Sequence, residues 1–221
     1  MARVDSQCLI IQFAKAPVPG KVKTRLQPVL KQSGCLALHT LLLEHTFGNL
    51  QKGDFSLELF VTSPHPYFSE LVFSAEKEIP VRIQCGADLG DRMFNAIDQG
   101  LQRYQQVVVV GSDCPAVDGE YLSQALECLD QQNDVVLGPA MDGGYALIGL
   151  ARVDKRLFEG VPWGSSEVLQ QTRNRLRNMG WRWGELSPVR DIDRHEDLEE
   201  LRKYPQFCTF LADHRQLIEI T

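Results

Sequence analysis

The chain has 221 residues, of which 43% are hydrophobic and 24% charged, as expected for a soluble globular protein. Its formal net charge of −6 argues against general binding to nucleic-acid backbones or anionic membranes, so any phosphate site must come from a local concentration of cations. No window approaches the roughly 20 apolar residues of a membrane span, and the six cysteines include no C-x-x-C pair. We therefore expect a cytoplasmic protein with reduced thiols and without membrane insertion.

Apolar runs of strand length alternate with helical patterns along most of the chain. The expected strands are 9–14, 57–61, 81–83, 107–110, 134–138 and 145–150. The expected helices between and after them are 35–50, 67–78, 89–104, 119–132 and 167–179. Strands separated by helices predict βαβ units, and continuous apolar strands fit a sheet buried on both faces. The pattern predicts an α/β fold with a mainly parallel sheet.

The last third of the chain does not continue the alternation of apolar strands and helices. Residues 160–164 are typical of a loop, 181–183 alternate like an edge strand, and 195–204 suit a charged surface helix. No segment is rich in Gly, Pro or Ser, and no repeat is present, so we expect a single domain over residues 1–221. The three tryptophans of this region pack either a dimer surface or the edge of the domain itself, which leaves a homodimer open.

A cationic loop follows the first expected strand. Ligands of an open α/β sheet bind beyond the carboxyl ends of its strands, which is the end this loop leaves. Two prolines and Gly20 give the loop a defined course, and Thr24 is expected to cap a helix that begins near residue 25. This favours phosphate binding over a solvated basic loop. The four cations, which fall within eleven residues, are Lys15, Lys21, Lys23 and Arg25.

Two sharper phosphate motifs are excluded. A P-loop would need glycine in place of Lys15 and Ser or Thr in place of Val22, and no G-x-G-x-x-G follows a strand. The histidines and cysteines show no zinc-binding spacing.

Asp113 comes just after the apolar strand 107–110, at the ligand-binding edge of the predicted sheet, and Pro115 fixes the turn there. A hard cation such as Mg²⁺ or Mn²⁺ binds carboxylate oxygens and keeps positions for phosphate. Asp113 is therefore a candidate metal ligand. The alternative is that it only caps the following helix.

A second turn at this edge, 138–145, contains paired glycines. Gly143 and Gly144 would let the backbone approach a ligand closely, and Asp142 and Tyr145 would then address hydroxyl groups of a sugar or an acceptor. The alternative is a plain Asp-Gly hairpin turn.

A third acidic segment lies at 190–198. Asp191 and Asp193 project to the same side of an extended chain, and two such charges repel by about 4 kcal/mol at 4 Å with an effective dielectric of 20. A divalent cation or an arginine would remove this repulsion. Asp193 could also cap a helix beginning near His195, with Glu196 completing a capping box.

Taken together, five blocks resemble a bacterial family of GT-A-like glycosyltransferases that is described as a domain of unknown function (DUF2064-type). They are residues 13–26, 88–93, 111–115, 138–145 and 191–198. The resemblance implies the nucleotide-diphospho-sugar transferase fold, a three-layer α/β/α arrangement with a mixed, mainly parallel sheet. The same scheme is similar to that of small nucleotidyltransferases, including guanylyltransferases of cofactor biosynthesis.

The resemblance also implies roles for individual residues. Lys15, Lys23 and Arg25 would contact phosphates in the loop that contains Gly20, and Asp113 would bind Mg²⁺ or Mn²⁺ with help from Asp193. One departure is that 112–114 carries a single carboxylate instead of a full D-x-D, which favours two carboxylates from distant segments. Another is Arg194, where threonine is commoner in these families.

The resulting hypothesis is a metal-dependent enzyme that uses a nucleotide-diphospho-sugar donor and an unidentified small-molecule acceptor. Asp142 is the candidate general base, and Gly143, Gly144 and Tyr145 are candidate contacts of the donor sugar or acceptor. Two alternatives stay open: a nucleotidyltransferase that releases pyrophosphate, and a nucleotide- or sugar-binding module without turnover.

Overall fold

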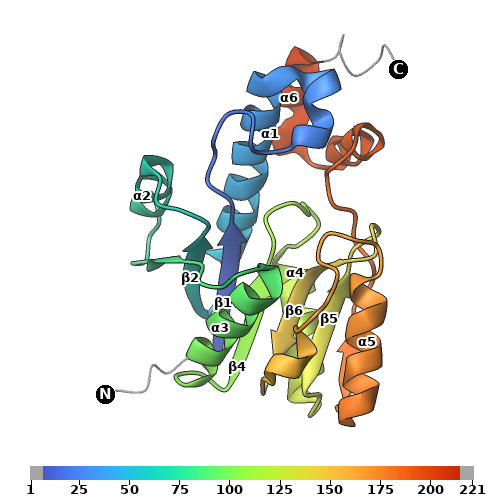
Figure 1. The fold of residues 1–221 in the computed structure, drawn as a ribbon. Helices are drawn as coiled ribbons and strands as arrows, with labels where there is room; N and C mark the ends of the chain where they lie inside the picture. The colour runs from blue at the N-terminus through green and yellow to red at the C-terminus, as the bar shows by residue number, and fades with distance from the viewer. Residues whose placement is uncertain (1–6, 215–221) are drawn as a thin grey trace.

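One mixed sheet organises the computed structural model, which describes residues 7–214 (Figure 1). Its strand order in the described chain is β3-β2-β1-β4-β6-β5-β7. Strand β6 runs antiparallel to β4 and β5, whereas the remaining neighbours pair in parallel. The predicted α/β fold with a mixed, mainly parallel sheet is confirmed. The strands are β1 (Cys8–Ala14), β2 (Ser56–Val61), β3 (Val81–Ile83), β4 (Gln106–Val110), β5 (Val135–Pro139), β6 (Tyr145–Leu150) and β7 (Trp183–Glu185).

Helices cover both faces of the sheet. Because side chains alternate along a strand, Leu9 and Ile11 of β1 pack with α3 and α5, whereas Ile10 packs with α4. Helices α1 and α2 cover β2 on the same side as α4 covers its neighbours. None of the helices in the described part of the chain has the length and apolar character needed to cross a bilayer. The helices are α1 (Gln27–Leu50), α2 (Pro66–Phe73), α3 (Leu89–Leu101), α4 (Gly119–Asp130), α5 (Val168–Met179) and α6 (Cys208–Asp213), with 3₁₀ turns η1 (Thr24–Leu26), η2 (Lys155–Leu157), η3 (His195–Lys203) and η4 (Pro205–Phe207).

Several predicted elements differ from the structure. Helix α2 ends at Phe73 instead of residue 78, and α3 ends at Leu101 instead of residue 104. Helix α1 begins at Gln27 instead of residue 35, with a proline in its first turn and a break in helical geometry at Lys31. The last edge strand is displaced by two residues: β7 pairs with β5 over Trp183–Glu185, with Trp183 beside Val135 and Glu185 beside Leu137. The predicted terminal helix over 195–204 is the 3₁₀ segment η3.

A small helical lobe stands beyond the carboxyl ends of the central strands. In Figure 1 it lies at the end toward which the β1 arrow points, where the start of α1 meets α6. Its own apolar cluster joins residues before and within α1 to the C-terminal segment. The lobe therefore fixes two distant segments, 15–26 and 190–194, at the ligand-binding edge of the sheet. The buried members of the cluster are Leu26, Leu30, Cys35, Leu38, Leu42, Ile192, Leu198, Leu201, Phe207 and Phe210.

A buried carboxylate secures the other side of the sheet. Glu58 of β2 is 3% exposed and accepts bonds from Arg82 Nε at 2.6 Å and Arg103 Nη1 at 2.7 Å. Burial alone would raise the pKa of Glu58, but the hydrogen bonds and charges of the two arginines outweigh it and lower that pKa. The ion pairs thus attach the edge strand β3 and the end of α3 to β2.

Glu58→Gln should lower the free energy of unfolding by about 2 kcal/mol at pH 7, because both arginines lose a buried partner. Because the pKa of Glu58 is lower in the folded than in the unfolded protein, its ion pairs stabilise the fold fully at a pH above the unfolded pKa near 4.5. This stabilisation is lost as the pH falls through the folded pKa of Glu58. The difference in the free energy of unfolding between wild type and variant, measured by urea unfolding, should therefore narrow below pH 4.5. A gap that stays constant with pH would contradict this account, and Glu70→Gln, at an exposed position, is the control.

Candidate functional site

A buried lysine lies at the centre of the ligand-binding edge. Lys23 Nζ is 2.5 Å from Asp113 Oδ1 and 3.5 Å from Asp193 Oδ1, and the lysine side chain is only 3% exposed. Arg25 Nη1 donates to the other oxygen of Asp193, Oδ2, at 2.8 Å. Four of the predicted site residues, from three distant segments, therefore form one network of alternating charge.

Both members of the central pair are held in their charged forms. For Lys23, burial acts to lower the pKa, but the charge and hydrogen bond of Asp113 and the charge of Asp193 raise it overall. For Asp113, desolvation acts to raise the pKa, but Lys23 lowers it overall. The edge of the sheet thus presents a fixed ammonium with two carboxylates beside it.

The backbone around Lys23 explains how its side chain reaches the sheet. Lys23 adopts the left-handed conformation, with φ 46° and ψ 40°, and its carbonyl accepts from Leu26 N at 2.9 Å. Val22 and Leu26 are buried on either side and anchor the turn. The predicted cap at Thr24 is wrong: Lys23 itself begins the short η1 turn, and no side chain caps it. A left-handed residue other than glycine is unfavourable, and such strain is concentrated at functional sites.

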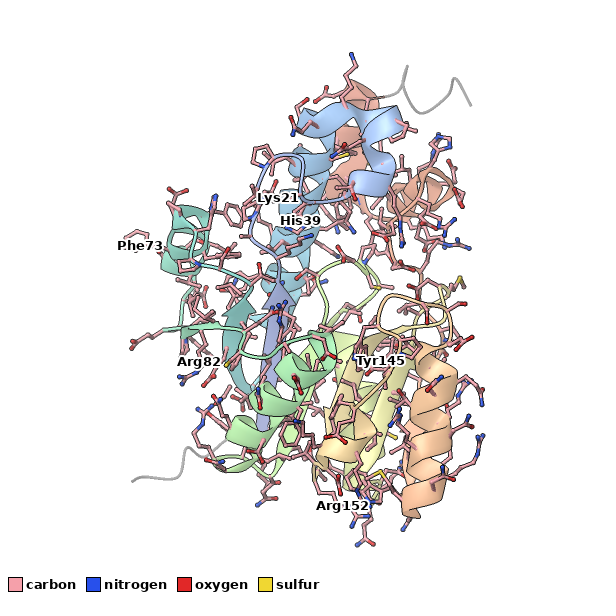
Figure 2. The ribbon with its side chains drawn as sticks, in the orientation of Figure 1. Lys21, His39, Phe73, Arg82, Tyr145 and Arg152 are labelled. Carbon is pink, nitrogen blue, oxygen red and sulfur yellow. The ribbon has the colours of Figure 1, made fainter. Side chains whose placement is uncertain are left out.

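The rest of the cationic loop is exposed but anchored. Lys15 points to solvent, while its carbonyl bonds to Nε2 of the buried His39 at 2.9 Å. The positive charge of Lys15 contributes to lowering the pKa of Asp113, which places it near the network. Gly20 has φ 76°, a conformation that favours glycine. Figure 2 labels Lys21 and His39 where this loop passes α1.

Asp113 does not cap the following helix, so that alternative is wrong. The cap of α4 is Asp118, whose Oδ1 accepts from Tyr121 N at 2.9 Å. The turn that carries Asp113 is instead fixed from both sides: Ser112 Oγ donates to the carbonyl of Phe13 at 2.9 Å, and Ile192 N donates to the carbonyl of Asp113 at 2.9 Å.

Asp193 does not cap η3 with its side chain, and the predicted capping box with Glu196 is also wrong. Asp197 Oδ2 accepts from Asp193 N at 3.1 Å and from Arg194 N at 2.7 Å. A carboxylate one residue later than expected therefore satisfies these donors. Asp193 is left to pair with Lys23 and Arg25.

The predicted glycine turn forms one wall of a pocket beside the network. Gly143 N donates to the carbonyl of Ala140 at 3.1 Å in the tip of the β5–β6 hairpin, so the hairpin alternative is confirmed. Asp142 Oδ1 accepts from Gly144 N at 2.8 Å, and both residues still line the pocket. Gly143 has φ 92°, and a side chain there would collide with the carbonyl of Ser166.

The pocket has a volume of about 280 Å³ and is lined by both acidic and apolar side chains. The acidic ones are Asp113, Asp142, Asp191 and Asp193. Tyr145, labelled in Figure 2, packs edge-on to Trp163 with ring centroids 6.3 Å apart, and burial raises the pKa of its phenol. The apolar lining is completed by Phe13, Leu89, Met93, Val109, Ala140, Ala146, Ile148 and Val168.

Asp191 and Trp163 are among the pocket residues that sequence reasoning did not assign. Asp191 was expected to share a side with Asp193, and burial, followed by the charge of Asp142, raises the pKa of Asp191 to about 6. The D-x-D spacing was the available signal. For Trp163 there was none, because its position depends on Gly90 of α3, where any side chain would collide with the indole.

The donor set fits a divalent cation. Asp113 Oδ1 and Asp193 Oδ1 lie 2.5 Å and 3.5 Å from the Lys23 ammonium, and hard carboxylate oxygens are what Mg²⁺ and Mn²⁺ prefer. Within residues 7–214, no group of three or more acidic, histidine or cysteine side chains is arranged to hold a metal. The protein would therefore supply two ligands, and phosphate or water would supply the others.

Residues 38–165 match the model of a family described as "Uncharacterized protein conserved in bacteria (DUF2064)". The chain belongs to this family. No match to the sequence is found among curated proteins.

Solved structures share the fold over nearly the whole chain. A protein of Desulfovibrio desulfuricans G20 with a provisional assignment as a nucleotide-diphospho-sugar transferase is 29% identical, covers 96% of this chain and 97% of its own, and gives a TM-score of 0.85. A 4-diphosphocytidyl-2C-methyl-D-erythritol synthase from Anaerococcus prevotii DSM 20548 is 10% identical, with coverages of 91% and 96% and a TM-score of 0.60. A manganese complex of a Mycobacterium tuberculosis H37Rv protein is 16% identical, with coverages of 90% and 100% and a TM-score of 0.50. The nucleotide-diphospho-sugar transferase fold is thereby confirmed.

The Lys23–Asp113 pair predicts a strong coupling between two substitutions. Asp113→Asn should destabilise the fold by about 1–2 kcal/mol, because the buried Lys23 ammonium then keeps only Asp193 as a partner. The loss is limited because Asp113 is half exposed and solvent partly screens its charge. Adding Lys23→Met to this variant should restore stability, since no buried charge is left without its partner. Urea unfolding of the two single variants and the double variant measures the coupling. Purely additive effects would contradict a buried ion pair.

Proposed function

We propose that this chain is a divalent-metal-dependent transferase that takes a nucleotide-diphospho-sugar and passes its sugar to a hydroxyl acceptor. The observation that carries the proposal is the direct junction between the Lys23–Asp113–Asp193–Arg25 network and the pocket of about 280 Å³. The charged network suits a diphosphate, and the adjoining pocket suits the sugar attached to that diphosphate.

The cations supply the phosphate contacts of the proposed donor complex. Arg25 is exposed and offers planar, paired donors, while Lys23 offers a point charge that is already fixed in place. Lys15 adds a further exposed charge on the same loop. In a chain of net charge −6, this is the local concentration of cations that phosphate binding requires.

Asp113 and Asp193 are the residues that would hold Mg²⁺ or Mn²⁺. A bound divalent cation supplies Lewis-acid neutralisation of the charge that develops on the leaving diphosphate. A fold relative solved as a manganese complex supports the use of a divalent cation, without indicating which residues bind it. Asp113 is held by its hydrogen-bonded turn and Asp193 by the Asp197 cap, so both carboxylates are positioned before any ligand arrives.

The pocket beyond the carboxylates would receive the transferred sugar and its acceptor. Tyr145 and Trp163 offer aromatic faces against which the apolar face of a sugar ring can pack. Asp142 lines the pocket, and its Oδ1 accepts a hydrogen bond from Gly144 N, which holds the carboxylate in place. In this proposal Asp142 removes the proton from the acceptor hydroxyl.

Nucleotidyl transfer is the second candidate, because a fold relative is named for a diphosphocytidyl product and because three cations on one loop also suit a triphosphate. The two reactions differ in the released product. A glycosyltransferase releases a nucleoside diphosphate, whereas a nucleotidyltransferase releases pyrophosphate.

Product analysis separates the candidates. The protein should be incubated with Mn²⁺ and, in one arm, a panel of nucleotide-diphospho-sugars and, in the other, nucleoside triphosphates with sugar 1-phosphates. We expect metal-dependent release of nucleoside diphosphate in the first arm. Pyrophosphate in the second arm alone would replace the proposal with nucleotidyl transfer. Metal-dependent binding without turnover in either arm would favour a binding module.

Asp142→Asn should lower transfer by 10²-fold or more and leave nucleotide affinity within about threefold, because the general base acts on the acceptor and not on the phosphates. Calorimetry with a nucleoside diphosphate measures the affinity, and a turnover assay measures the transfer rate. Met141→Leu, at the neighbouring exposed position, is the matched control. Equal losses of binding and turnover in Asp142→Asn would remove its role as base.

A further inference from the structure

The point where the two candidate metal ligands meet is occupied by a side chain of the protein itself. Lys23 Nζ lies 2.5 Å from one carboxylate and 3.5 Å from the other, and the side chain is 3% exposed. Arg25 neutralises the second oxygen of Asp193 from the solvent side. The free protein therefore carries its own cation between Asp113 and Asp193.

The backbone keeps this internal cation in place. Lys23 is in the left-handed conformation between the buried residues Val22 and Leu26, so the ammonium is directed to the sheet edge by a fixed turn and not by a flexible surface chain. Asp113 is equally constrained, since its carbonyl accepts from Ile192 N and its neighbour Ser112 is bonded to Phe13. The backbone of both partners is therefore held in place.

A divalent cation bound by the same two oxygens would lie within a few ångströms of this ammonium, and the two positive charges would repel. The ammonium must then exchange Asp113 for another anion. A phosphate oxygen of the donor is such an anion, and Arg25 can exchange Asp193 for phosphate in the same way. Without phosphate, a buried ammonium would be left with no partner, which is strongly unfavourable.

Building on the proposed function, we infer that Lys23 acts as a resident counter-cation that excludes a free divalent metal, so that the site accepts metal and phosphate together, as a metal–nucleotide complex. The ligand class that the free site recognises is therefore a nucleoside polyphosphate already bound to its metal. Lys23 is a positioning residue in this scheme: it blocks the carboxylates in the free protein and binds phosphate once the metal has arrived.

The test measures Mn²⁺ binding without any nucleotide, by the loss of the free-ion signal in electron paramagnetic resonance. Wild type should bind Mn²⁺ weakly. Lys23→Met, which keeps the apolar stem and removes the charge, should bind Mn²⁺ at least tenfold more tightly. Lys23→Arg should stay as weak as wild type. Arg25→Ala is the matched control, and it should change Mn²⁺ affinity less than Lys23→Met because it leaves Asp113 paired with Lys23.

A second measurement uses unmodified protein and stands even if Lys23→Met fails to fold. Pyrophosphate should raise the affinity of wild type for Mn²⁺ at least tenfold beyond the association of Mn²⁺ with pyrophosphate in solution. Equal Mn²⁺ affinity with and without pyrophosphate, or unchanged affinity in a folded Lys23→Met variant, would overturn the counter-cation role and leave the proposed function in place. No Mn²⁺ binding by any variant, with or without pyrophosphate, would overturn both.

Discussion

The architecture of the site depends on one ion pair, between the buried Lys23 and the half-exposed Asp113. A lysine that is 3% exposed can stay charged only beside carboxylates, and here the carboxylates come from the end of β4 and from the segment before η3. The pair therefore ties the N-terminal loop, the centre of the sheet and the C-terminal lobe together. Anything that binds at this edge must compete with that pair or extend it.

The mixed direction of the sheet supplies the second half of the site. Because β6 runs antiparallel between β4 and β5, the tip of the β5–β6 hairpin lies at the same edge as the carboxyl end of β4. Asp142 on that tip and Asp113 after β4 consequently line one pocket. An all-parallel sheet would have required a crossover helix between these strands and would not have placed a tight turn beside the cations.

Much of this arrangement could be predicted from the sequence, because strand-length apolar runs and the loops that follow them locate the ligand-binding edge. Lys23, Arg25, Asp113 and Asp193 were all identified as site residues and lie together. Side-chain roles within the turns were harder to predict. Asp118 caps α4 in place of Asp113, and at η3 the N-cap position is Arg194 in place of Asp193, with Asp197 bonding back in place of Glu196. Capping depends on where the chain enters the helix, and this can shift by one or more residues.

Features that depend on packing between distant segments could not be predicted from the sequence either. Trp163 reaches the pocket only because Gly90 on a distant helix leaves room for it, and no local pattern reports such a contact. Lys23 and Lys31 likewise have positive φ angles of 46° and 55°, which lysine does not favour by itself and which no local pattern indicates.

In the proposed complex, Asp113 and Asp193 hold a metal whose bound phosphates lie on Lys23 and Arg25. Crystals grown with Mn²⁺ and a nucleoside diphosphate test it most directly, through the anomalous signal of manganese. We expect one strong peak between the carboxylates of Asp113 and Asp193, with phosphate oxygens on Lys23 Nζ and the Arg25 guanidinium. A nucleotide bound elsewhere, or a manganese peak away from both carboxylates, would contradict it.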